Sequence, residues 1–102
     1  MTVKPAIWFK VFKRDKGICQ YCGISLLQNI SLYFSATVDH IVSKVVGGTD
    51  DIENLVCSCR ACNSMLTRKK DLKTFTGRKS HVLKRRQEVQ KDLEDWILKI
   101  DS

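Results

Sequence analysis

The sequence contains only two histidines, and none of its segments is apolar enough to cross a membrane. The uncharged stretch over residues 17–38 is interrupted by glutamine, asparagine and serine, whereas a spanning helix needs about 20 predominantly apolar residues. Near the N-terminus, residues 7–12 are broken by Lys10 and followed by Lys13 and Arg14, so the apolar core of a secretory signal is missing. We therefore expect a cytoplasmic protein without a membrane segment.

Internal repeats and low-complexity segments are also absent from the sequence. A chain of 102 residues is long enough for one compact core and too short for two. Apolar residues make up 43% and charged residues 28%, which is ordinary for a globular protein and argues against disorder. We therefore predict a single domain over residues 1–102.

Acidic residues are outnumbered, with 11 Asp and Glu against 18 Lys and Arg, and the formal net charge is +7. The excess is concentrated in residues 60–86, where Asp71 is the single acid. A solvated charged face is the ordinary explanation of such a run, but this density favours contact with phosphates and hence a DNA partner. The predicted nucleic-acid-binding residues are Arg60, Arg68, Lys69, Lys70, Lys73, Arg78 and Lys79.

Four of the five cysteines form two Cys-x-x-Cys pairs, Cys19 with Cys22 and Cys59 with Cys62. In a reducing compartment, four thiolates in two such turns can surround one zinc ion tetrahedrally. The alternatives are a two-cysteine redox motif and two disulfides. The presence of a second Cys-x-x-Cys pair disfavours the redox motif, and the missing secretion signal disfavours the disulfides. We therefore predict a structural zinc site. Cys57 is predicted to be a small buried apolar residue rather than a ligand in place of Cys59.

The hydrophobic pattern predicts two short strands between flanking helices. The predicted elements are a helix over 5–16, an irregular segment or short strand over 25–34, strands over 34–38 and 55–57, and helices over 63–70 and from 78 or 80 to 100. The first strand leads directly to Asp39 and His40. Glycines 47 and 48 and the two residues after them predict a turn between the strands.

The last predicted helix carries an apolar stripe, which is made of Val82, Val89, Leu93, Trp96, Ile97 and Ile100. Such a stripe most often packs on the core of its own chain. A helix of about 20 residues spans about 30 Å, which is comparable with the whole domain. Its distal part could therefore overhang and bind another protomer, which would make a homodimer through the C-terminal helix.

The two histidines lie in different contexts. His81 has no acidic or cysteine neighbour, and we expect it at the surface. Several spaced motifs surround His40: Val38-Asp39-His40-Ile41, Gly47-Gly48, Asn54-Leu55, Cys59-Arg60-Ala61-Cys62-Asn63 and, upstream, Arg14-Asp15-x-Gly17-x-Cys19-x-Tyr21-Cys22-Gly23. Together they resemble the HNH endonucleases of the zinc-knuckle type over residues 15–70, which leaves the last third of the chain uncovered.

This resemblance implies an α+β fold, a small ββα-metal domain with a four-cysteine zinc site, a core of about residues 14–70, and flanking N- and C-terminal helices. It also implies that His40 is the general base, that Asn54 supports it and that Asn63 binds a catalytic metal. Asn63 stands where the family's name has a histidine. Because amide oxygens suit hard cations, we expect Mg²⁺ or Mn²⁺ at this position beside the structural Zn²⁺.

Physical chemistry supports the same assignment. Hydrolysis of a phosphodiester needs a deprotonated water and a cation that neutralises developing charge. The imidazole of His40 can accept a proton near neutral pH, and Asp39 and Asn63 offer oxygen ligands to one metal. Successive side chains alternate along a strand, so Asp39 and His40 reach one phosphate only if the strand ends or distorts there. Thr67 and Lys70 are expected on the helix face of Asn63.

The predicted function is therefore a metal-dependent endonuclease that hydrolyses DNA phosphodiester bonds. The alternative is a non-enzymatic, zinc-stabilised nucleic-acid-binding module. That module would need the cysteines and the basic residues, but it would not need Asp39, His40 and Asn63. A small protein-interaction zinc domain would leave the basic excess unexplained.

Overall fold

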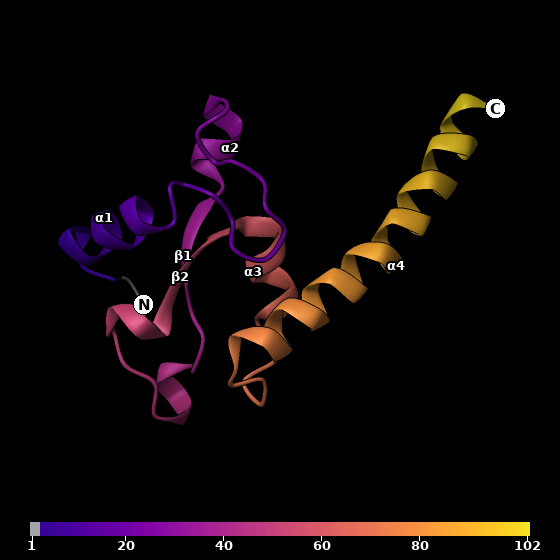
Figure 1. The fold of residues 1–102 in the computed structure, drawn as a ribbon. Coiled ribbons are helices and arrows are strands. Elements are labelled where there is room, and N and C mark those ends of the chain that lie inside the picture. Colours follow the sequence, from indigo (N-terminus) through magenta and orange to yellow (C-terminus); the bar gives the residue numbers. More distant parts are fainter. Residues whose placement is uncertain (1–2) are drawn as a thin grey trace.

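A two-stranded antiparallel sheet followed directly by a helix lies at the centre of the fold (Figure 1). The computed structural model describes residues 3–102. Its elements are α1 (Pro5–Arg14), α2 (Ile30–Phe34), β1 (Ala36–His40), β2 (Leu55–Cys59), α3 (Arg60–Leu66) and α4 (Phe75–Asp101), with short 3-10 turns at Lys44–Val46 and Ile52–Asn54. The fold is α+β, and the predicted ββα layout is confirmed.

Strand β2 is buried along its whole length, because α1 and α3 both pack against it. Its partner β1 runs antiparallel, with Ala36 opposite Cys59 and His40 opposite Leu55. This register places Cys59 at one end of the sheet and His40 at the other. The four-cysteine cluster and the histidine site are therefore built on opposite ends of the same two strands.

Two glycines occupy positions where a side chain would not fit. Gly17, just after α1, has a φ of +66°, and a Cβ there would lie 2.8 Å from Leu27. In the loop between the strands, a Cβ on Gly48 would lie 1.8 Å from the carbonyl oxygen of Val42. The loop that leads from His40 towards β2 is therefore folded tightly back on itself.

Several predicted elements differ from the structure. The first helix ends at Arg14 rather than at residue 16, and the first strand covers Ala36–His40 rather than residues 34–38. The prediction of an irregular segment or strand is wrong for Ile30–Phe34, which forms α2 because the Asn29 side chain accepts a hydrogen bond of 2.9 Å from the Leu32 N–H. Helix α3 begins before residue 63, because the Cys59 sulfur accepts from the Cys62 N–H. It ends at Leu66, so Lys70 lies beyond the helix.

Helix α4 begins at Phe75, earlier than predicted, because the Thr74 hydroxyl accepts a hydrogen bond from the Gly77 N–H. Its first turns pack on the body of the protein through Arg78 and Val82. From residue 87 onward every residue is exposed, and this part of the helix projects away from the rest of the chain (Figure 1). Within residues 3–102, no helix combines the length and the apolar character that a membrane span requires.

Candidate active site and metal centre

The two Cys-x-x-Cys pairs come together in space. The sulfur atoms of Cys19, Cys22, Cys59 and Cys62 all lie within 4.8 Å of one another. In each pair, the N–H of the second cysteine donates to the sulfur of the first at 3.5 Å, which closes the turn. Gly23 follows the first pair with a φ of +82°, a left-handed conformation that glycine adopts without strain. The predicted cysteine cluster is therefore present.

The cluster has the ligands and the size of a tetrahedral zinc site. Four sulfurs at about 2.3 Å from one ion would be separated by roughly 3.8 Å, and Cys22 Sγ lies 3.8 Å from Cys59 Sγ. Hydrogen bonds with Cys59 and Cys62 lower the pKa of the Cys19 thiol, and hydrogen bonds with Cys19 and Cys59 raise the pKa of the Cys62 thiol. The thiols thus compete for negative charge, which a bound divalent cation would neutralise.

Cys57 lies outside the cluster, as the sequence predicted. Its side chain is fully buried in the core, and burial raises the pKa of its thiol to about 12. Its backbone is used structurally, since its N–H donates to Asp15 and its carbonyl accepts from the Gln20 N–H, both at 2.9 Å. Cys57 is therefore a neutral core residue of β2, and its backbone joins this strand to the first Cys-x-x-Cys turn.

At the other end of the sheet, one open cavity of about 610 Å³ gathers three of the four residues predicted for catalysis and for the catalytic metal. Asp39 and His40 line it from β1, Asn63 lines it from α3, and Thr67 and Lys70 extend the same wall. Strand β1 ends at His40, which lets two neighbouring side chains share one cavity. Asn63 is distant in sequence from Asp39 and His40, and the ββα layout brings the three residues to one cavity.

Asn54 holds the loop between β1 and β2 and does not line this cavity. Its side-chain oxygen accepts from the Val42 N–H at 2.8 Å, and its amide nitrogen donates to the carbonyls of Val42 and Thr49. The side chain therefore uses both ends of its amide to fix the segment that follows His40.

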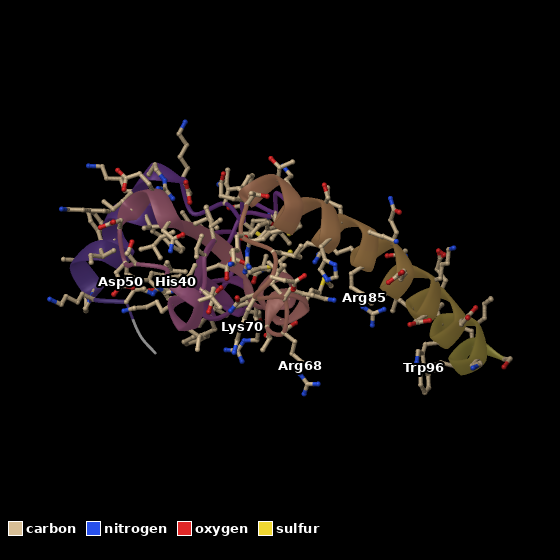
Figure 2. The ribbon with its side chains drawn as sticks, turned by 90° about the horizontal axis from the view of Figure 1, so that it is seen from below. His40, Asp50, Arg68, Lys70, Arg85 and Trp96 are labelled. Carbon is tan, nitrogen blue, oxygen red and sulfur yellow. The ribbon has the colours of Figure 1, made fainter. Side chains whose placement is uncertain are left out.

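His40 has a partner that the sequence analysis missed. Its Nε2 lies 2.8 Å from a carboxylate oxygen of Asp50, whose other oxygen accepts from Lys44 at 3.1 Å, and Figure 2 shows Asp50 beside His40. The hydrogen bond with His40 and the neighbouring Lys44 lower the pKa of Asp50, so it stays a carboxylate. The only sequence feature that points to this contact is the position of Asp50 in the loop between His40 and Asn54, and the glycines before it favour a turn residue instead.

Asp39 is buried and already paired. One Arg78 Nη atom donates to both of its carboxylate oxygens, at 3.0 and 2.9 Å, and the Tyr21 hydroxyl donates to Oδ2. Burial and the nearby Asp39 charge raise the pKa of Tyr21, so the phenol stays protonated. Burial alone would lower the pKa of Arg78, but Tyr21 and Asp39 raise it. Asp39 is therefore a carboxylate with a matched counter-ion.

Arg78 thus differs from the other residues of the predicted nucleic-acid-binding set. It is only 4% exposed, and its guanidinium is occupied by Asp39, Tyr21 and the Leu72 carbonyl. Lys79 is half-buried beside the Phe75 ring, and the exposed members are Arg60, Arg68, Lys69, Lys70 and Lys73. Figure 2 shows Arg68 and Lys70 pointing outward. Arg78, by contrast, belongs to the interior of the site.

The Arg78→Met variant tests the importance of this buried ion pair. Removing the guanidinium leaves the Asp39 charge buried without a counter-ion, which costs about 3–5 kcal/mol of folding free energy. We expect a large fall in the urea midpoint of unfolding. Arg85→Met is the matched control on the same helix, because its pair with Glu88 is half exposed and contributes less than about 1 kcal/mol. Equal effects of the two substitutions would contradict this role of Arg78.

Comparison with known proteins agrees with this geometry. The architecture and the cysteine cluster define a small ββα protein with a metal site. The family model for HNH endonuclease matches residues 19–69, which is half of the chain and contains both knuckles, Asp39, His40, Asn54 and Asn63. The chain therefore belongs to the HNH endonuclease family, and this membership supports a nuclease-type function. Searches of curated proteins and of solved structures give no match.

Proposed function

We propose that the protein is an endonuclease that hydrolyses phosphodiester bonds of DNA with Mg²⁺ or Mn²⁺. The observation that carries this proposal is the single cavity lined by Asp39, His40 and Asn63, because it unites a proton acceptor with two oxygen donors. Family membership supports it independently. We further propose that the protein acts in the cytoplasm, where thiols stay reduced and the zinc ligands are available.

His40 is the proposed general base. The Asp50 carboxylate can only accept a hydrogen bond, so in the neutral imidazole the proton lies on Nε2 and the lone pair on Nδ1. Within residues 3–102 no hydrogen bond occupies Nδ1, which leaves it free to take a proton from water. Asp50 fixes the tautomer, and Asn54 fixes the loop behind it. Both act as positioning residues.

Asp39 and Asn63 are the proposed ligands of the catalytic cation. Mg²⁺ is commonly held by one or two protein oxygens and keeps several waters, so this small donor set fits it. Oδ1 of Asp39 accepts one hydrogen bond and keeps a lone pair for the ion. When bound, the cation would neutralise charge that develops on the phosphate. Lys70, on the cavity wall, would attract the phosphate, while exposed arginines and lysines hold the flanking backbone.

A non-enzymatic nucleic-acid-binding module is the second candidate. The buried pair of Asp39 and Arg78 favours it, because the carboxylate is already neutralised without a metal ion. Such a module would bind DNA equally well in the presence and absence of Mg²⁺, and it would leave plasmid DNA intact.

A plasmid-nicking assay on the zinc-loaded protein separates the two functions. We expect nicking with Mg²⁺ or Mn²⁺, and none with extra Zn²⁺ or with EDTA. Asn63→Ala removes one proposed ligand, so it should need a higher Mg²⁺ concentration for half-maximal rate, while Ser64→Ala, its neighbour on α3, should behave as the wild type. DNA binding that persists without nicking at any Mg²⁺ or Mn²⁺ concentration would instead support the binding module.

A further inference from the structure

The distal half of α4 is a helix without a tertiary partner among residues 3–102. Residues 87–101 are all exposed and make up more than half of this 27-residue helix. Isolated helices of about 15 residues are marginally stable in water, and most helices are stabilised by packing of an apolar face. Trp96 is 62% exposed, and Figure 2 shows it near the projecting end. This segment therefore has a surface that a partner would cover.

The exposed apolar residues follow the spacing of a two-helix seam. Val89, Leu93, Trp96 and Ile100 are separated by four, three and four residues, which is the 3.5-residue period of a coiled coil. The preceding position of the same series is Arg86, whose guanidinium donates to Cys62 Sγ at 3.4 Å. The seam thus begins where α4 leaves the body of the protein.

The charges beside the seam select the partner and its direction. Asp92 and Lys99 lie seven residues apart on the same side of the seam. If two copies pair antiparallel, with Leu93 of one against Trp96 of the other, Asp92 of each copy faces Lys99 of the other. In a parallel pair, Asp92 would lie beside Ile97. The charges beside the seam are therefore complementary between two copies in the antiparallel direction only.

We propose that two copies of this chain associate through residues 89–100 of α4 as an antiparallel helix pair. The apolar layers are Val89 against Ile100 and Leu93 against Trp96, each occurring twice by the two-fold symmetry. The two symmetry-related ion pairs between Asp92 and Lys99 lie along one side of these layers and fix the register. The proposal rests on α4 alone and is independent of DNA hydrolysis.

Sedimentation equilibrium of the full zinc-loaded chain tests the pairing. We expect a concentration-dependent dimer, and we expect Leu93→Lys to be monomeric over the same concentrations because it places two charges in the apolar seam. Asp92→Lys and Lys99→Asp should each weaken the dimer about tenfold, since two attractive pairs become repulsive. Glu94→Lys, at an exposed position of α4 outside the seam, is the matched control and should leave the dissociation constant unchanged.

The charge-swapped variant Asp92→Lys/Lys99→Asp decides the direction. In the antiparallel pair it restores both ion pairs, so its dissociation constant should return to within about twofold of the wild-type value. Circular dichroism checks that each variant keeps its fold. A wild-type chain that stays monomeric at every concentration would overturn the proposal, and so would a double variant as weak as the single ones.

Discussion

The His40→Ala variant is expected to lose plasmid nicking by about 10²–10⁴-fold while it keeps its affinity for DNA. The imidazole is the proposed proton acceptor, and alanine removes it without touching the cation ligands or the exposed basic residues. DNA affinity depends mainly on lysines and arginines that contact phosphate, so it should remain within about twofold. Single-turnover nicking with Mg²⁺ measures the first quantity, and fluorescence anisotropy with a labelled duplex measures the second.

The chain supplies its own control in His81, the other histidine. It lies on α4 and lines a separate cavity of about 370 Å³ with Arg68, Lys69 and Arg85. His81→Ala should therefore leave the nicking rate within about threefold of the wild type. If His40→Ala retained full nicking activity, another group would be the base. If it lost DNA binding and nicking in parallel, His40 would be a binding residue instead.

Removal of the zinc ion is expected to unfold the protein. The binding of structural zinc contributes about 10–16 kcal/mol in small zinc domains. This is comparable with, or larger than, the whole folding stability of a typical domain, which is about 5–15 kcal/mol. Here the cluster fixes both knuckles and the start of α3, so the ββα centre depends on it. Far-ultraviolet circular dichroism during chelation, with zinc release followed by a colorimetric indicator, measures the effect.

Two cation additions and two variants make this test specific. After chelation, added Zn²⁺ should restore the fold and added Mg²⁺ should not. Cys62→Ser removes a ligand and should abolish stable folding, whereas Cys57→Ala changes a buried cysteine outside the cluster and should cost only about 1 kcal/mol. A chelated protein with unchanged circular dichroism would show that the cluster does not hold the fold together.

Short-range patterns in the sequence predicted the centre of the fold well. The two cysteine pairs, the alternation of residues 34–38 and the motif around His40 each reflect neighbours within a few residues. Asp39, His40 and Asn63 could therefore be assigned to one site from spacing and resemblance, and the cavity between β1 and α3 contains all three. Their chemical roles remain predictions that the experiments above address.

Other features depend on contacts between distant residues, which no local pattern reveals. Arg78 lies 39 residues from Asp39 and sits in a run of basic residues, so its burial could not be separated from the charge of its neighbours. Asp50 lies in a predicted turn, where acidic residues are common. Its contact with His40 depends on how the loop folds around Asn54, which the local sequence does not indicate. The segment Ile30–Phe34 becomes helical through one asparagine cap, which its mixed apolar and polar pattern did not indicate.

The position of Arg78 has a consequence for where the structural unit of this HNH protein ends. The family match stops at residue 69, yet the counter-ion of Asp39 comes from the first turn of α4, and Arg86 reaches back to the sulfur of Cys62. A chain cut after the matched region would retain every signature residue, yet Asp39 would have lost its neutralising arginine and Cys62 its N–H donor. The smallest fragment that keeps both contacts is accordingly longer than the motif by which its family is recognised.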